Sequence, residues 1–409
     1  MQLFVGGEEL DFSLSEEEEL LQRTVKDFLT EHLVPRSREI DKAGRMPRDL
    51  LRKMGRMGLL GITVSKEFGG SEASFVEAAL VAEEIGRADM SMATAVFYLV
   101  EAGWGYILGK YGALELKDEV LPAVTSGEAF LGIASTEPGG GSDILSMRTT
   151  VEQRDDLLVM NGEKTFISGV VEAATMGGGF LTLAKSDPTR GHSGFSICFL
   201  PVKDMPGVST TRIEQMGREG ISNGALGIDD VKLPKHYLVG DWNRGFYYAM
   251  EGFGVARVLV SAACVGAAER ALQEAIRYVK ERQAFGRPIG KFEGVQFPLV
   301  EDHARIDSVK LLVLRAAWMQ DRHREEGRFS QSEINEAVAK AKLEAVPAAF
   351  KTIRDVMEWH GAYGYTKEAG LEMGLRGITS YLVGAEGSQN MMKLILAREI
   401  LGKEYLPYR

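Results

Sequence analysis

The stretch of sequence that decides the fold is Thr136-Glu137-Pro138-Gly139-Gly140-Gly141-Ser142-Asp143. Its glycines let backbone N–H groups approach a phosphate or a flat heterocycle, because no Cβ stands in the way. Pro138 stiffens the entry to the stretch, and Thr136 and Ser142 add hydroxyl donors. No strand–helix–strand unit surrounds it, so it is not the GxGxxG fingerprint of dinucleotide-binding folds. Taken alone, it predicts a polar, turn-rich loop between strands.

The length and composition are those of a globular enzyme with more than one core. A chain of 409 residues with 45% hydrophobic content predicts two or three domains. The net charge of −10 and the lack of a Lys/Arg-rich run argue against a nucleic-acid partner. Cys198 and Cys264 stand in apolar or small-residue segments without metal-ligand neighbours, so we expect reduced core cysteines and no metal site.

The sequence predicts neither a membrane span nor an export signal. No apolar run reaches the ~18 residues that a span requires, and Ala93 to Val100 is taken as the nearest to one. The N-terminal segment is acidic at Glu16 to Glu19 and has no basic region followed by an apolar core. We therefore expect a cytoplasmic protein.

The first third of the chain has helical periodicity. Ser15 and Glu18 form a capping box, which predicts the start of a helix. Further helices are expected from Pro47 and through Val76 to Ile85. These signals assign residues 1–128 to an N-terminal α-helical domain.

The next segment, residues 129–241, has the alternation of strands. Leu157 to Ile167 is interpreted as two strands that meet at Asn161-Gly162, the strongest short signal for a β-hairpin. Gly194 to Val202 and Ala225 to Leu233 are also expected to be strands. The segment is therefore predicted to be a β domain.

Helical periodicity returns in residues 242–409. Apolar residues from Val255 to Val279 lie on one face of a long helix. Ser330 and Glu333 predict a capping box at the start of a later helix. Three helices are expected after the long one, centred near Leu311, Ala341 and Leu394. The segment is therefore predicted to form a four-helix domain.

Two later segments change the interpretation of the glycine-rich loop. They are Asn161-Gly162-Glu163-Lys164-Thr165-Phe166-Ile167-Ser168 and Glu281-Arg282-Gln283-Ala284-Phe285-Gly286-Arg287-Pro288-Ile289. Together with residues 136–143, and in this order, they resemble the acyl-CoA dehydrogenase family of flavoproteins, from about Phe12 to about Gly402. The resemblance implies an α+β multidomain fold with an N-terminal α-helical domain, a middle β-barrel-like domain and a C-terminal four-helix bundle. It also implies FAD, an acyl-CoA substrate, an electron-transfer flavoprotein as partner and a homo-oligomer, expected as a tetramer.

A reaction of this type needs a base that removes the proton next to the thioester carbonyl. In the largest branch of the family the base is the Glu of a Glu-Gly-Thr motif before the last helix, and the match here is Glu386-Gly387-Ser388. The isovaleryl-CoA branch places its base before an arginine of the first bundle helix, where this chain has Ala256 before Arg257. The resemblance therefore assigns the base to Glu386 and a site-shaping role to Arg257. Without the motif, Glu386 would be read as a helix cap and Arg257 as a surface cation.

The resemblance also assigns a set of residues to the cofactor. Those expected to contact FAD are Thr136, Gly141, Ser142, Phe166, Ser168, Arg282, Phe285, Gln296, Gly361 and Ser388. Arg282, Phe285 and Gln296 would reach the ADP half of an FAD that a neighbouring subunit mainly binds. Phe166 could equally be a strand core residue, and the other three could form an ordinary charged helix end.

Two departures from the family pattern concern the cofactor. Glu358 stands where the family usually has Gln, and a carboxylate near the FAD phosphates would repel them. Gly377 follows Arg376 where the family has Asp. The contact that the family makes here is therefore expected to be absent or rearranged.

A third departure concerns the substrate. Ala385 replaces the bulky aromatic that precedes the base, which opens space over the acyl chain unless Tyr381 or Tyr98 fills it. The change favours a branched, alicyclic or aryl-bearing acyl group. Residues 89–100 contain no basic side chain, so a dicarboxylate substrate would need its cation elsewhere.

The sequence thus predicts an FAD-dependent acyl-CoA dehydrogenase that introduces an α,β double bond. One alternative is an oxidase on the same scaffold, which would return electrons to oxygen and produce peroxide. Another is a non-catalytic flavin-containing binding protein, for which Glu358, Gly377 and the altered Glu386 loop are the support.

Overall fold

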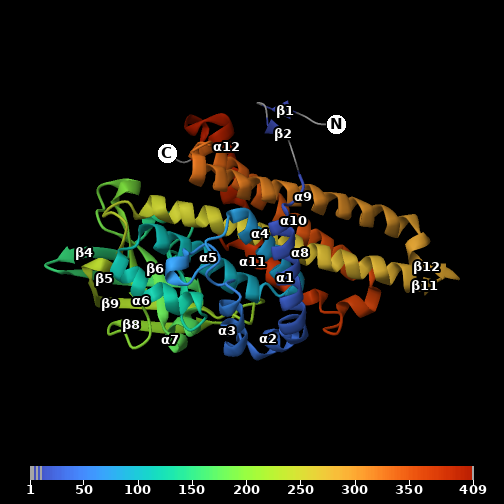
Figure 1. Ribbon diagram of the computed structural model, residues 1–409, viewed down its shortest axis with the longest axis horizontal. Coiled ribbons are helices and arrows are strands. Elements are labelled where there is room, and N and C mark those ends of the chain that lie inside the picture. The colour runs from blue at the N-terminus through green and yellow to red at the C-terminus, as the bar shows by residue number, and fades with distance from the viewer. Residues whose placement is uncertain (1–3, 6–7, 10–11, 408–409) are drawn as a thin grey trace.

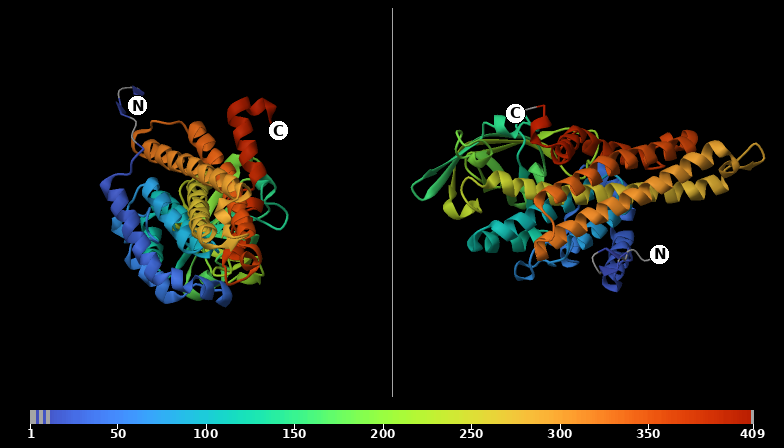
Figure 2. Two further views of the ribbon diagram at one scale, coloured as in Figure 1. Left: turned by 90° about the vertical axis from the view of Figure 1, so that its right-hand side faces the viewer. Right: turned by 90° about the horizontal axis from the view of Figure 1, so that it is seen from above.

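The computed structural model describes residues 4–5, 8–9 and 12–407. Two short strands, β1 (Phe4–Val5) and β2 (Glu8–Glu9), precede the first helix. Helices occupy the chain from Glu16 to Thr125, strands predominate from Phe130 to Val239, and helices return from Gly245. The sheet lies at one end of the elongated molecule, and the long C-terminal helices run from it to a hairpin at the other end (Figure 1). The views in Figure 2 show the N-terminal helices along one side of that bundle.

The N-terminal helices begin at local capping signals. The predicted capping box of Ser15 and Glu18 is confirmed at the start of α1, and Ser74 with Glu77 caps α4 in the same way. Nearly every side chain of α5 is buried, as for a helix surrounded by protein on all sides. The helices are α1 (Glu16–His32), α2 (Ser37–Ala43), α3 (Arg48–Arg56), α4 (Phe75–Ala88), α5 (Ala93–Tyr111) and α6 (Leu114–Thr125).

The middle of the chain forms one mixed sheet. Its order is β10-β7-β6-β4-β5-β9-β8, with β3 parallel to β6 outside this path. The strands are β3 (Phe130–Ala134), β4 (Thr150–Arg154), β5 (Leu157–Ser168), β6 (Gly178–Lys185), β7 (Phe195–Pro201), β8 (Val208–Ile213), β9 (Asn223–Pro234) and β10 (Leu238–Val239). A short helix, α7 (Val170–Met176), follows β5. The strands expected near residues 194–202 and 225–233 are confirmed by β7 and β9.

The hairpin predicted at Asn161-Gly162 is wrong, because β5 runs straight through it. The turn lies earlier, between β4 and β5, where Asp155 has a φ of 50°. The Asn161 side chain instead accepts a 2.7 Å hydrogen bond from the backbone N–H of Asp230 on β9. Gly162 has a φ of 146°, and a Cβ there would lie 2.5 Å from Oγ1 of Thr149. The Asn-Gly pair therefore marks a bulge in the pairing with β9.

The C-terminal segment has the predicted helices and one more. The chain forms α8 (Gly245–Glu281), α9 (Glu293–Glu326), α10 (Gln331–Trp359), α11 (Leu371–Val383) and α12 (Gln389–Leu401). The capping box of Ser330 and Glu333 is confirmed at the start of α10. The sequence analysis missed α11, whose glycines weaken its helical signal. Gly377 is needed there, because a Cβ would lie 2.3 Å from the carbonyl oxygen of Ser91.

By length and composition alone, α8 could cross a membrane. Its most apolar window has a mean hydropathy of 1.4, but 72% of that window is buried inside the fold. The helices α4, α5 and α10 pack against it. Because the core helix of a globular protein passes the same test, the finding is weak evidence for a membrane span. Arg257 and Glu269 interrupt its apolar residues in the sequence.

The helices α4 and α8 touch through their backbones. A Cβ at Gly86 of α4 would lie 2.0 Å from the carbonyl oxygen of Ala263, and one at Gly266 of α8 would lie 1.8 Å from that of Glu83. No other residue type fits at such distances without separating the helices. This glycine seam joins the N-terminal helices to the bundle.

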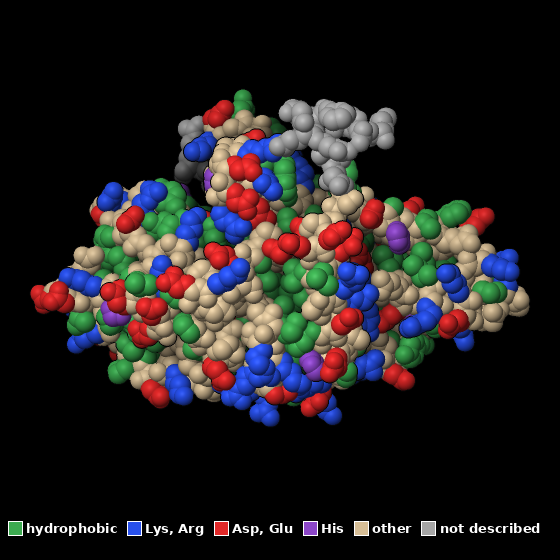
Figure 3. Space-filling model, viewed as in Figure 1, with side chains coloured by type: hydrophobic (Ala, Val, Ile, Leu, Met, Phe, Trp, Pro, Cys, Tyr) green, Lys and Arg blue, Asp and Glu red, His purple; other side chains and the backbone are tan. Residues whose placement is uncertain are grey.

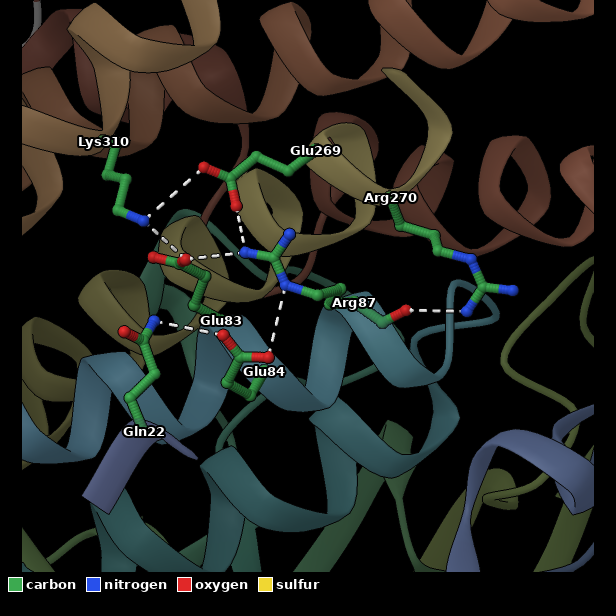
Figure 4. A network of polar contacts seen from close by, with 7 residues as sticks. All are labelled: Gln22, Glu83, Glu84, Arg87, Glu269, Arg270 and Lys310. Carbon is green, nitrogen blue, oxygen red and sulfur yellow. Dashed lines mark hydrogen bonds and ion pairs between the residues drawn. The ribbon is translucent and has the colours of Figure 1, made fainter. Parts of the chain in front are cut away.

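A buried ion-pair network lies beside the glycine seam (Figure 4). Arg87 of α4 pairs with Glu83, Glu84 and Glu269, and Lys310 of α9 lies 2.6 Å from Glu83 and 3.5 Å from Glu269. Burial, followed by the charge of Glu269, raises the pKa of Glu83 to about 7. The network therefore ties three helices from both ends of the chain together.

Candidate active site

The predicted base lies on the loop between α11 and α12. Glu386 has a φ of 56°, in the left-handed region that side chains other than glycine rarely adopt. Ser388 is the N-cap residue of α12, and its side chain accepts a hydrogen bond from the backbone N–H of Met391. The loop that carries Glu386 is therefore fixed on one side by the start of a helix.

Two cations hold the same loop by its backbone. Nε of Arg257 on α8 donates a 2.8 Å hydrogen bond to the carbonyl oxygen of Glu386. Nζ of Lys342 on α10 donates to the carbonyl oxygens of Ala385, at 2.6 Å, and of Gly387. Lys342 is fully buried. Sequence analysis predicted Arg257 but missed Lys342, which is one of two lysines in the alanine-rich stretch of α10 and has no sequence signal that distinguishes it from Lys340.

The carboxylate itself is left without a hydrogen-bond partner at one oxygen. Oε2 of Glu386 is buried and unpaired among the described residues. Burial raises the pKa of Glu386, while Lys342, Arg257 and Arg218 act in the opposite direction. Burial lowers the pKa of Arg257 to about 10 and that of Lys342 to about 8. A carboxylate with a raised pKa and a free oxygen suits proton removal from a ligand.

The glycine-rich loop lies on the sheet domain, held against β5. The backbone N–H of Thr165 donates a 2.9 Å hydrogen bond to the carbonyl oxygen of Thr136. Gly141 and Ser142 are exposed on the loop, and a Cβ at Gly139 would meet no atom within 4 Å. The loop therefore presents open backbone and hydroxyl groups to solvent.

A buried ion pair that the sequence analysis missed supports this loop. Nζ of Lys164 lies 3.0 Å from Oε1 of Glu137, and both side chains are buried. Glu137 also accepts hydrogen bonds from the backbone N–H groups of Arg148, at 2.7 Å, and Thr149, at 2.9 Å. Burial lowers the pKa of Lys164 to about 8, and Glu137 opposes that shift. Both residues belong to the quoted motifs, but their spacing in the sequence does not predict that they form an ion pair.

Phe166 and Ser168 stand near the end of β5. Phe166 is 64% exposed and has a φ of 56°, at a register shift between β5 and β9. The alternative of a strand core residue is therefore wrong for Phe166. Ser168 is half-buried two positions along the strand.

The residues present fit a flavin on two observations. An exposed aromatic face at Phe166 stands beside the open glycine-rich loop, as a flat heterocycle requires. Near the base, both polar atoms of the Gln389 side-chain amide are buried without a partner among the described residues. Buried polar atoms of this kind call for a ligand or water.

The residues expected to meet the ADP half of FAD lie elsewhere, at the hairpin of β11 (Gln283–Ala284) and β12 (Arg287–Pro288). Phe285 is 95% exposed, and Arg282 is also exposed. The amide nitrogen of Gln296 donates a 2.7 Å hydrogen bond to the carbonyl oxygen of Gly290. The hairpin lies at the opposite end of the molecule from the sheet (Figure 1). Within one copy of the chain, these residues are therefore at the opposite end of the molecule from the sheet that carries Phe166.

Gly361 begins a short turn after α10, with a φ of 59°. The preceding His360 stacks on Tyr278 of α8 with ring centroids 4.1 Å apart. Glu358 is exposed nearby, with Arg354 at 3.9 Å. This turn therefore flanks α8 near its C-terminal end.

The fold and site combine a buried carboxylate on a fixed loop with a separate, open glycine-rich loop on a sheet. Profiles of the acyl-CoA dehydrogenase N-terminal, middle and C-terminal domains match residues 15–128, 132–231 and 243–401, in that order. The chain belongs to the acyl-CoA dehydrogenase family. Members of this family are FAD-dependent oxidoreductases. The predicted family, fold class, enzyme class and cofactor are confirmed.

Similar proteins cover almost the whole chain. A probable acyl-CoA dehydrogenase of Bacillus subtilis (strain 168) is 32% identical over 96% of this chain and 100% of its own length. A subunit of the caffeyl-CoA reductase-Etf complex of Acetobacterium woodii is 31% identical over 95% and 99%. The structure of glutaryl-coenzyme A dehydrogenase with glutaryl-CoA is 31% identical, with a TM-score of 0.88 over 96% of this chain and 97% of that chain.

Proposed function

We propose that the chain desaturates an acyl-CoA thioester between its α and β carbons, with Glu386 as the base. The single observation that carries the assignment is the free, buried Oε2 of Glu386 on a loop held by Arg257 and Lys342. Glu386 takes the α-proton, and the electron pair of that C–H bond enters the new double bond. When bound, FAD would supply the acceptor for the hydride that leaves the β carbon.

The protein's own groups favour loss of the α-proton in two ways. Arg257 and Lys342 donate hydrogen bonds to backbone carbonyl oxygens of the loop. The carboxylate is therefore held in position without forming an ion pair of its own. The backbone N–H of Glu386 would donate to the thioester oxygen, where negative charge develops as the proton leaves. Exclusion of water by the ligand strengthens both effects.

The proposed cofactor site combines residues from two copies of the chain. Residues from one copy would hold the flavin ring and ribityl chain, and these are Thr136, Gly141, Ser142, Phe166, Ser168 and Ser388. Arg282, Phe285 and Gln296 of a neighbouring copy would meet the ADP half, with Gly361. The exposure of Phe285 at 95% supports a partner at this position.

The proposed substrate has bulk near its reacting carbons. Ala385 is partly buried against the core, and the side chain before the base is small. Tyr381 is fully buried on α11. We therefore propose a branched, alicyclic or aryl-bearing acyl group.

The proposed partners follow from the family and from one relative. An electron-transfer flavoprotein would reoxidise the cofactor, as the name of the Acetobacterium woodii relative supports. A homotetramer would complete the split cofactor site. We place the enzyme in the cytoplasm.

Anaerobic titration of the purified holoprotein tests the proposed function. Heat-released cofactor should amount to about one FAD per chain, and straight, branched, alicyclic or aryl acyl-CoA thioesters should bleach its absorbance. Failure of every thioester to bleach bound flavin would contradict desaturation. Rapid aerobic peroxide production would instead identify an oxidase.

A further inference from the structure

A buried arginine outside the motifs quoted above acts on the charge of the proposed base. Arg218 stands on the loop between β8 and β9 and is only 8% exposed. The Gln215 side chain holds this loop by donating to the carbonyl oxygens of Arg218, at 3.0 Å, and Ile221, at 2.7 Å. Gly220 of the same loop packs against Ala93 at the start of α5. The loop therefore brings a guanidinium from the sheet domain to the junction of α5 and α11.

The guanidinium of Arg218 faces the side of the site formed by α11. Its Cζ lies 5.9 Å from the ring centroid of Tyr381. Its charge acts on Glu386, where it is one of three cations that oppose the raised pKa. It also opposes the rise that burial causes in the pKa of Tyr381. Arg218 therefore lies beside Tyr381 of α11 and acts electrostatically on Glu386.

The hydrogen-bonding capacity of Arg218 is largely unused. Its Nε is buried without a partner, and its Nη2 has only a long 3.4 Å contact to the amide oxygen of Gln215. The hydroxyl of Tyr381 is also buried; its oxygen can accept from Arg218, which opposes the rise in the pKa of Tyr381, but no described acceptor receives its own proton. Two donors in one place thus lack an acceptor.

The nearby acids are already engaged. Asp41 pairs with Arg376 at 2.7 Å, and Glu219 faces the charges of Arg212 and Arg376. No described carboxylate lies within ion-pair distance of Arg218, and Glu386 is the only acid that counters Arg257. On the face shown in Figure 3 acidic and basic side chains are interspersed. In the interior, three cations (Lys342, Arg257 and Arg218) act on the one carboxylate of Glu386. Burying an unpaired guanidinium is costly unless a ligand supplies the anion.

We propose, given the proposed function, that Arg218 and Tyr381 bind a carboxylate at the far end of the acyl group. The substrate class is then an acyl-CoA whose chain carries a second carboxylate, whether or not that chain is also branched or cyclic. A guanidinium binds a carboxylate with two parallel hydrogen bonds, and the free Nε of Arg218 is available for one of them. Arg218 is the cation that a dicarboxylate would need and that residues 89–100 do not supply.

Matched pairs of thioesters test this proposal on the unmodified holoprotein. Succinyl-, glutaryl- and adipyl-CoA differ from butyryl-, pentanoyl- and hexanoyl-CoA only by a carboxylate in place of the terminal methyl group. At one chain length or more, the carboxylate member should have the higher kcat/KM for anaerobic flavin reduction, by about 10- to 100-fold. If every neutral member equals or exceeds its partner, the proposal is wrong while desaturation still stands. If no thioester bleaches the flavin, the dissociation constants of the carboxylate and neutral members of each pair are compared by calorimetry instead.

The variant Arg218→Gln tests whether Arg218 causes the preference for the carboxylate thioester. It should lose the preference for the carboxylate member, so that the ratio of kcat/KM within each pair falls towards one, while FAD content is kept. Arg212→Gln, on exposed β8, is the matched control and should keep the preference. Loss of FAD from Arg218→Gln would place the arginine in the cofactor site and overturn the proposal. An equal loss for both members, with a shifted pH profile, would make Arg218 a tuning group for Glu386 and also overturn it. Should Arg218→Gln not fold, Tyr381→Phe must weaken the same preference.

Discussion

Arg257 donates its 2.8 Å hydrogen bond to the backbone carbonyl of Glu386, not to the carboxylate. A cation that paired with the carboxylate would hold it ionised and weaken it as a base. Because Arg257 bonds to the backbone, it fixes the position of the Glu386 main chain and leaves Oε2 of the side chain without a partner. Lys342 does the same at the two flanking carbonyls, so positioning and proton transfer are served by different atoms of one loop.

Glu386→Gln should bind acyl-CoA and FAD but reduce flavin more slowly by a factor on the order of 10² to 10⁴, because only the proton-accepting group is lost. Stopped-flow absorbance under anaerobic conditions measures the rate. The exposed Glu404→Gln near the C-terminus is the control and should be unaffected. Rapid reduction by Glu386→Gln would move the base elsewhere, and Glu251 on α8 would then be the first residue to test.

Lys342→Met should destabilise the protein and alter the pH dependence of flavin reduction. Two carbonyls lose a buried donor, and each unmade hydrogen bond costs about 1–3 kcal/mol. Lys342 lowers the pKa of Glu386, so its removal raises that pKa and moves the acid limb of the pH–rate profile to higher pH. Thermal unfolding and the pH profile are the measurements. Lys340→Met, which removes a half-exposed lysine paired with Glu336, should leave the acid limb in place.

Ala385→Tyr should reverse the preference among acyl groups. In the unmodified protein we expect thioesters with bulk near the α and β carbons to exceed butyryl- and octanoyl-CoA in kcat/KM. A tyrosine beside the base fills that space and should favour the straight chains. Ala385→Ser, which adds little volume, is the control. Straight chains that are preferred by the unmodified protein would count against a widened acyl site.

Arg282→Ala should weaken both FAD retention and association of the subunits. The variant loses a proposed charge-assisted contact with the diphosphate, worth ~1.5–3 kcal/mol. Because the cofactor would bridge two copies, its loss lowers the stability of the assembly as well. Sedimentation at several concentrations, with FAD absorbance, measures both. Arg277→Ala, on the exposed face of α8, is the control. A holo monomer with full FAD occupancy would refute the shared site.

Glu101→Gln should stabilise the protein at neutral pH. Both oxygens of Glu101 on α5 are buried without a side-chain partner among the described residues, and burial raises its pKa well above the ordinary value, with only the backbone N–H of Leu131 acting in the opposite direction. The folded state therefore binds the proton more tightly than the unfolded state. That contribution is full below the unfolded pKa of about 4.5 and is lost as pH rises towards the folded pKa.

The amide cannot titrate, so Glu101→Gln escapes this loss. Its melting temperature should exceed that of the unmodified protein at about pH 7.5 and match it at about pH 4. Glu67→Gln, which changes an exposed side chain, should show no such difference. A variant that is equally destabilised at both pH values would contradict a neutral Glu101.

Structural features that depend on neighbouring residues were predictable from the sequence, and contacts between distant residues were not. The capping boxes at Ser15 and Ser330 depend on residues three positions apart, and both are confirmed. The Asn161-Gly162 turn failed because pairing with β9 overrode its local preference. Glu386 and Arg257 are 129 residues apart, and only the family resemblance brought them together. Lys342 and Arg218 gave no such signal, since their roles depend on the loops that fold around them.

The glycine seam between α4 and α8 also sets the order of events during synthesis. Its two sides are far apart in the chain, and Arg87 and Glu269 beside it are separated by 182 residues. At the usual rate of translation, α8 leaves the ribosome roughly 10 to 35 s after α4. During that interval the N-terminal helices lack α8, against which α4 packs, and their apolar faces are exposed to chaperones. We therefore expect the N-terminal third to complete its packing only after the bundle has been synthesised.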